Sequence, residues 1–138
     1  YENRVTNNLH FFFFVSFPWI YLLYNRHQLA AITDNVIFDT IAREWRCKWS
    51  PDNDKASLTA AQSLIEEYLP KIKAIDGLKS VQRVVCGDCK DIKLIIAFQA
   101  DKFDKLAEAN LEEGFLTGLK AIEGLDTIET QTFTLMPM

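Results

Sequence analysis

Two cysteines three positions apart are the most chemically suggestive feature of this sequence. Cys86 and Cys89 enclose a Gly-Asp pair between two stretches rich in β-branched residues. Such a pair can supply half of a tetrahedral zinc site, or it can form a redox couple. It can equally be two small residues that flank a tight turn, and a single CxxC does not decide between these alternatives. We expect no bound metal and no cofactor, and we keep Cys86 and Cys89 as candidate zinc ligands.

Charged residues surround this motif. Asp88 and Asp91 could bind a ligand amine or a cation, although aspartates also form turns. Lys93 follows on an apolar strand, where it would either be ion-paired or face an anionic ligand. The predicted ligand-binding residues are therefore Gly87, Asp88, Asp91 and Lys93. The sequence has no phosphate-binding glycine loop and no nucleophile elbow, so it predicts no catalytic residue.

An internal repeat predicts the elements that position these residues. Lys73–Leu78 (KAIDGL) returns as Lys120–Leu125 (KAIEGL), an offset of 47 from position 73 to position 120. Each copy is typical of a helix end, a glycine turn and a strand. The apolar strand predicted at Asp91–Gln99 maps by this offset onto Glu44–Asp52, where Trp45 and other apolar residues alternate with charged ones. Each copy is therefore strand, helix, strand, and the predicted fold is a ferredoxin-like βαββαβ domain of the α+β class.

The pattern predicts the bounds of these elements within a domain spanning residues 43–138. We expect strands at 43–50, 78–86, 91–99 and 125–135, and helices that begin near Ala56 and Asp101. Pro70 should kink or restart the first helix. Glu112-Glu113-Gly114 should break the second helix before Phe115 resumes it.

Residues 1–42 differ from the rest of the chain. Phe11–Tyr24 is a continuous apolar run interrupted by Pro18, and it is shorter than the roughly 20 residues that a membrane-spanning helix needs. It could be a targeting or anchoring segment, a buried or partner-docking segment, or a non-native leader. Gln28–Ala42 is predicted to be an amphipathic helix. Because no methionine precedes Met136, we take the chain to be a processed product, a fragment or a translation begun upstream of the start.

Charge and sheet geometry predict the partners. The formal net charge of -4 and the pI near 5.1 argue against nucleic acid, which requires a basic face. Two helices on one sheet face leave the other face bare, with Lys93, Ile95 and Ala97 as candidate residues on it. A bare apolar face predicts a C2 homodimer or docking onto a larger complex. We expect a soluble domain in a reducing compartment, with membrane attachment through residues 11–24 as an option.

The segment from Leu69 to Leu135 resembles the effector-binding (RAM) domain of the Lrp/AsnC regulators, a dimeric α/β barrel. The resemblance depends on Ile75–Leu78, Val81, Val84–Gly87, Asp91, Ile122–Leu125 and Thr127–Thr130. It implies an amino-acid-like ligand at a dimer interface. The chain departs from that family in two ways: residues 1–42 show no helix-turn-helix, and the hairpin is one residue longer between Gly87 and Asp91.

Three functions follow, in order of preference. The first is a non-catalytic, regulatory homodimer that binds a small metabolite at its interface. The second is a structural or accessory subunit of a membrane-associated complex, docked through the apolar segment. The third is an enzyme that uses the barrel cavity, as small monooxygenases of this fold do; it ranks last because the strands offer few polar groups to such a cavity.

Overall fold

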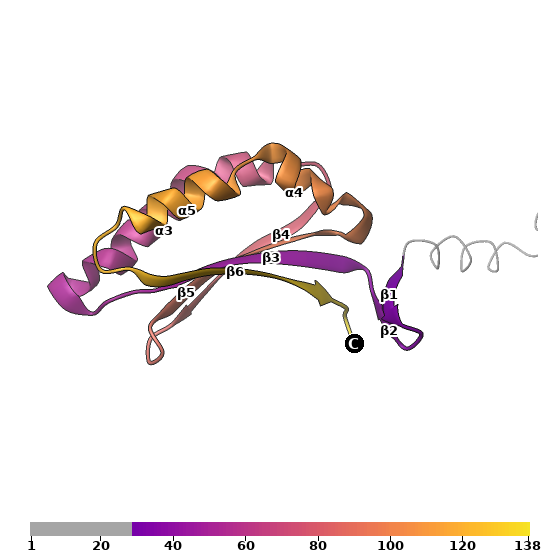
Figure 1. Ribbon diagram of the computed structural model, residues 1–138, viewed down its shortest axis with the longest axis horizontal. Helices are drawn as coiled ribbons and strands as arrows, with labels where there is room; N and C mark the ends of the chain where they lie inside the picture. Colours follow the sequence, from indigo (N-terminus) through magenta and orange to yellow (C-terminus); the bar gives the residue numbers. More distant parts are fainter. Residues whose placement is uncertain (1–28) are drawn as a thin grey trace, which may run out of the picture. The chain divides into compact units, whose positions relative to one another are not determined.

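The computed structural model describes residues 29–138, and Phe38–Met138 form one compact unit. Its sheet contains β3 (Thr40–Lys48), β4 (Leu78–Cys86), β5 (Asp91–Gln99) and β6 (Asp126–Leu135) in the antiparallel order β4-β5-β3-β6. The helices are α3 (Asp52–Lys73), α4 (Asp104–Ala109) and α5 (Glu112–Lys120), preceded in the second half by the short η1 (Ala100–Lys102). All of them cover the same sheet face (Figure 1). The predicted ferredoxin-like βαββαβ fold is confirmed.

The core lies between the helices and the two central strands. Alternate residues of β3 and β5 point toward the helices, and the buried ones are Trp45, Cys47, Ile92, Leu94, Ile96 and Phe98. Phe115 of α5 stacks on Trp45 at 4.7 Å between ring centroids and meets the edge of Tyr68 of α3 at 5.3 Å. These three rings tie both helices to the sheet, because aromatic pairs at such distances contribute beyond their buried area.

The repeat appears as two matching turns. Gly77 and Gly124 follow the last helix of each half and have φ of +84° and +92°, a conformation that glycine adopts without steric cost. A Cβ on Gly77 would overlap the Lys102 side chain, and one on Gly124 would lie 3.0 Å from Ser57 Cβ. Both glycines are therefore required by backbone conformation and by close packing.

The two helical segments differ. The backbone of α3 is non-helical at Asn53–Lys55 and continues through Pro70 to Lys73, so the right-handed helix starts near Ala56, as predicted, and Pro70 does not end it. The break in the second segment lies at Asn110, two residues before the predicted position. Asn110 has φ of +55°, which asparagine tolerates better than most residues. Glu112 and Glu113 instead open α5, where carboxylates suit the positive helix terminus.

The helix predicted over Gln28–Ala42 is wrong for the residues that the structure describes. They form β1 (Ala30–Thr33), β2 (Val36–Phe38), which pairs with it, and the start of β3. The Asp34-Asn35 pair favours a turn, and the β-branched residues around it favour strands. The apolar run Phe11–Tyr24 lies outside the described residues. Within the described part, no helix is both long and apolar enough to cross a membrane.

Candidate functional site

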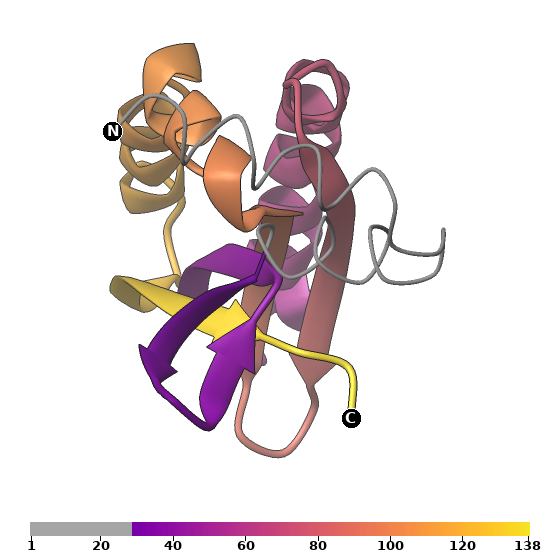
Figure 2. The same cartoon turned by 90° about the vertical axis from the view of Figure 1, so that its right-hand side faces the viewer.

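A pocket opens where the second helical segment is interrupted. Its volume is about 380 Å³. Its walls come from η1 to the start of α5 on one side and from β3 and β6 on the other: Arg43, Phe103, Asp104, Leu106, Ala107, Asn110, Leu111, Glu112, Glu113 and Thr132. Figure 2 shows the α4–α5 segment beside α3 and above the sheet. The wall is mixed: four of these ten residues are apolar, and four are charged, namely Arg43, Asp104, Glu112 and Glu113.

A carboxylate and a guanidinium meet at this wall. Arg43 Nε donates to Glu112 Oε1 at 2.6 Å, and Arg43 Nη2 donates to Glu112 Oε2 at 3.2 Å. Trp45 Nε1 donates to the same Oε1 at 2.6 Å. The two-point contact fixes the plane of the Arg43 guanidinium relative to the plane of the Glu112 carboxylate. The indole N–H therefore ties this ion pair to the buried aromatic core.

Two threonines of β6 complete the support of Arg43. Arg43 Nη1 donates to Thr132 Oγ1 and Nη2 donates to Thr130 Oγ1, both at 2.9 Å. The threonines at alternate positions of β6 therefore share the helix-covered face with Arg43. Residues on the other register, such as Phe133, share the open face with Ala42, its cross-strand partner. Arg43 is thus held by three side chains before any ligand arrives.

The ion pair also sets the protonation state of Glu112. The hydrogen bond from Arg43 holds the pKa of the Glu112 carboxyl below its usual value, with further lowering from Trp45 and only partial opposition from burial. Glu112 is therefore a carboxylate at neutral pH and a weak base. The arrangement offers a fixed cation at the edge of a pocket that Asp104 and Glu113 also line, and such a cation can stabilise negative charge on a bound oxygen atom.

The predicted ligand-binding residues lie elsewhere, and none of them lines this pocket. Gly87 and Asp88 lie in the exposed β4–β5 turn. Asp91 lies at its base, where Lys48 Nζ approaches Oδ1 at 2.7 Å and Arg46 Nη2 approaches Oδ2 at 3.3 Å. The hydrogen bond from Lys48 is the main reason that the pKa of Asp91 is lowered. A ligand-binding role for these residues stays a prediction.

Lys93 lies on the open face of the sheet and is paired. Its Nζ is 3.7 Å from Oε1 of Glu44, and Glu44 is only 3% exposed. With Arg46 and Asp91 on the same face, one end of this face is charged. The open face is therefore apolar only around Ile95 and Ala97. The expectation that this face is bare and apolar is corrected by the charged residues of β3.

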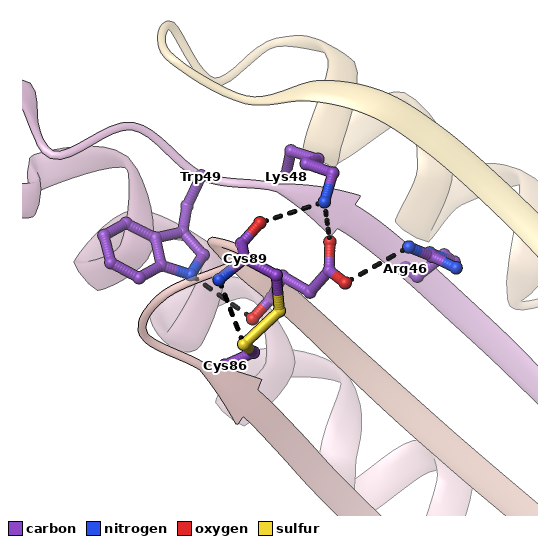
Figure 3. Close-up of a disulfide and its surroundings, with 6 residues drawn as sticks. Arg46, Lys48, Trp49, Cys86 and Cys89 are labelled. Atoms are coloured by element: carbon purple, nitrogen blue, oxygen red, sulfur yellow. Dashed lines mark hydrogen bonds and ion pairs between the residues drawn. A yellow bond between two sulfur atoms is a disulfide. The ribbon is translucent and has the colours of Figure 1, made fainter.

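The cysteine motif forms a disulfide, Cys86–Cys89, with a Cα–Cα distance of 5.5 Å (Figure 3). In this oxidised state the two sulfur atoms are bonded to each other and are not thiolate ligands for zinc. The third cysteine, Cys47, is a free thiol and is buried. Burial raises the pKa of its thiol to about 11, with smaller contributions from Asp126 and Asp91, so it is an unreactive thiol.

Sequence reasoning missed the residues that build the pocket. Arg43 and Glu112 are 69 positions apart, and neither belongs to a recognisable motif. The apolar alternation placed Trp45 on a strand, but it did not predict the N–H contact of Trp45 with Glu112. The one available signal was the threonine alternation in β6, which predicts a polar stripe on one strand face without saying which face.

No protein-family model matches the chain, and no curated protein matches it significantly. Solved structures do match. Rv0793 from Mycobacterium tuberculosis shares 16% identity at a TM-score of 0.52, covering 72% of this chain and 97% of that one. A mutant of SnoaB, a cofactor-independent oxygenase from Streptomyces nogalater, shares 18% sequence identity at a TM-score of 0.52, and the match covers 72% of this chain and 96% of that one. A proposed antibiotic biosynthesis monooxygenase from Caulobacter crescentus shares 10% sequence identity at a TM-score of 0.55, and the match covers 72% of this chain and 92% of that one.

These matches correct two expectations. They share the ferredoxin-like fold of this chain, and they do not specifically support the Lrp/AsnC RAM family. The expected non-catalytic metabolite-binding function, with a membrane-complex subunit as its alternative, is wrong. That expectation is overturned by the matched proteins whose activity is named, which are oxygenases or proposed monooxygenases. At these identities the likeness itself shows the fold alone.

Proposed function

We propose that this chain is a small oxygenase that oxidises an enolisable organic substrate with O₂ in the α4–α5 pocket. The observation that carries the proposal is the Arg43 guanidinium, held in one geometry at the wall of a pocket that also has apolar lining residues. The fold shared with a cofactor-independent oxygenase supports it. Among the described residues, Nη1 of Arg43 donates to Thr132 alone, which leaves its second N–H for a substrate oxygen.

The chemistry follows from what a fixed cation does to a weak acid. A substrate with a CH₂ group beside a carbonyl loses a proton more readily when a guanidinium stabilises its enolate oxygen. The electron-rich enolate can then react with O₂. The CH₂ group becomes C=O, one oxygen atom enters the product, and the other leaves as water with the two hydrogens. The substrate supplies all four electrons, so the reaction balances without another reductant.

Glu112 is a positioning residue in this scheme. Its lowered pKa makes it a poor proton acceptor, and both of its oxygens accept hydrogen bonds from Arg43 or Trp45. Its role is to orient the guanidinium and to keep the site charged. The proton therefore passes to water or to the bulk buffer, and substrates with acidic C–H groups should react fastest.

The test uses 2-tetralone, an aromatic ketone with an activated CH₂ group. Full-length protein should accelerate O₂ uptake, and ¹⁸O₂ should place one labelled oxygen in the diketone product by mass spectrometry. Arg43→Lys keeps the charge but cannot make the two-point contact with Glu112, and it should retain only part of the rate. Arg83→Ala is the matched control, since Arg83 bonds Gln62 outside the pocket. Equal rates for Arg43→Lys and wild type, or no label in the product, would refute the proposal.

We also propose that the chain is a homodimer that pairs through the open sheet face. Phe133 and Leu135 of β6 and Val84 of β4 are apolar residues on this face, and Val84 and Leu135 are each 42% exposed. The dimeric barrels among the matched structures support this assembly. Light scattering on the full chain should give twice the monomer mass, and Leu135→Asp should lower it. A monomeric wild type would contradict the pairing.

A further inference from the structure

The β4–β5 turn is the second place where the chain could do chemistry. It projects on the side of the sheet away from the helices (Figures 1 and 2). Cys89 is exposed and Cys86 is half-buried. The turn contributes no residue to the α4–α5 pocket, so what it does is independent of the proposed oxidation.

The fold does not depend on this disulfide to close the turn. The two nine-residue strands pair as far as Cys86 and Asp91, and Trp49 N donates to Lys90 O at 2.9 Å. The cysteines are only three positions apart. The stabilisation that a disulfide provides through chain entropy decreases with the length of the loop it closes. A structural role therefore accounts poorly for the pair, and reversible chemistry becomes the better explanation.

The surroundings distinguish the two sulfur atoms. The backbone N–H of Cys89 donates to Cys86 Sγ at 3.1 Å, a contact that would stabilise a thiolate on Cys86 after the bond breaks. Lys48 Nζ lies 2.9 Å from Cys89 O (Figure 3), which places a cation beneath the turn. Asp88 and Asp91 oppose this charge, and Asp91 is itself paired with Lys48. Cys86 is thus the better leaving group, and Cys89 is the accessible target.

We propose that Cys86–Cys89 is a thiol–disulfide exchange site for low-molecular-weight thiols. A thiolate attacks Cys89 Sγ, forms a mixed disulfide, and releases Cys86 as a thiolate. A second thiolate attacks the outer sulfur of that mixed disulfide and releases Cys89. Two thiols are oxidised to one disulfide, the protein bond takes up two electrons, and the protons of the two thiols are returned to Cys86 and Cys89.

The first test is an equilibrium titration of the full-length wild type, with glutathione as the probe. The protein is held at graded ratios of reduced to oxidised glutathione, and free thiols are alkylated and located by mass spectrometry. Labelling of Cys86 and Cys89 should rise together as the buffer becomes more reducing, while the buried Cys47 stays unlabelled as an internal control. A disulfide that stays intact for an hour at millimolar reduced glutathione would overturn the proposal.

The second test locates the attacked sulfur in the oxidised wild type. The protein is mixed with reduced glutathione and quenched with acid at short times, and the mixed disulfide is mapped by mass spectrometry. Glutathione should be found on Cys89, with Cys86 as the free thiol. Cys86→Ser and Cys89→Ser, each loaded with glutathione, supply the two reference adducts, and tryptophan fluorescence checks that both keep the fold, since Trp49 contacts this region through Asp91. Glutathione found on Cys86, or equally on both cysteines, would refute the assigned order of attack.

Discussion

The two halves of the domain share one sequence repeat and differ in one helix. In the first half α3 passes without a break from about Ala56 to Lys73. In the second half the helical segment stops at Asn110 and restarts at Glu112. The pocket opens at that interruption. The shared repeat supplies the sheet and its covering helices, and the α4–α5 pocket lies where the second half departs from the repeat.

The charged groups follow the same division. Arg43 of the first half reaches Glu112, Thr130 and Thr132, all from the second half. An arginine contact made within the first half, Arg83 with Gln62, lies at the surface. The α4–α5 pocket therefore lies beside a half-buried, oriented ion pair that joins the two halves, whereas the Arg83–Gln62 contact is exposed.

The largest expected effect is on catalysis. Arg43→Ala removes the cation that faces the pocket and leaves Glu112 unpaired. Loss of one oxyanion-stabilising donor typically lowers turnover by about 10²–10³-fold, and we expect a loss of that order in 2-tetralone oxidation. Arg83→Ala should keep the wild-type rate. If both variants lose activity equally, the asymmetry between the halves is not functional.

The paired glycine turns should respond unequally. Gly77→Ala and Gly124→Ala each force alanine into a left-handed backbone, which costs roughly 1–2 kcal/mol. Gly77→Ala should cost more because its Cβ would overlap Lys102, whereas Ser57 lies 3.0 Å from a Cβ at Gly124. Urea unfolding measures both free energies. A larger loss for Gly124→Ala would show that the two turns pack differently from this description.

The helix break at Asn110 should also respond to substitution. Asn110→Ala removes a residue that tolerates φ of +55°, so we expect a destabilisation of about 1 kcal/mol. Asn110→Gly keeps the break and should be neutral or slightly stabilising. Oxidation of 2-tetralone should fall in the alanine variant and not in the glycine variant. If the glycine variant loses more activity than the alanine variant, the activity of the pocket does not depend on the helix break.

The smallest effect concerns acid stability. Because the folded pKa of Glu112 is lowered from 4.5, its ion pair stabilises the fold above that pH, and this contribution is lost as pH falls through the folded pKa. Glu112 is 36% exposed, so screening should keep the contribution under about 1 kcal/mol. Glu112→Gln should be less stable than wild type at pH 7 and should converge with it in acid. A constant difference across this range would contradict the ion-pair account.

The sequence predicted the elements where local signals agreed with the tertiary structure. The repeat placed β4 and β5 at their observed bounds, since glycine turns and apolar alternation are local properties. The helix predicted from apolar spacing at Gln28–Ala42 was wrong, because β-branched residues and a turn produce strands there. The Arg43–Glu112 pair could not be predicted, because only the antiparallel register and the break at Asn110 bring these distant residues together.

The most direct test of the central claim is an NMR titration of ¹⁵N-labelled full-length protein with 2-tetralone. If the α4–α5 pocket is the site, the amide chemical shifts of Arg43, Thr132 and residues 103–113, which surround the pocket, should change. The Arg43→Ala variant should weaken this response. Shift changes confined to Gly87–Lys93, or to the first half around α3, would contradict the assignment of the site to the interrupted half of the repeat.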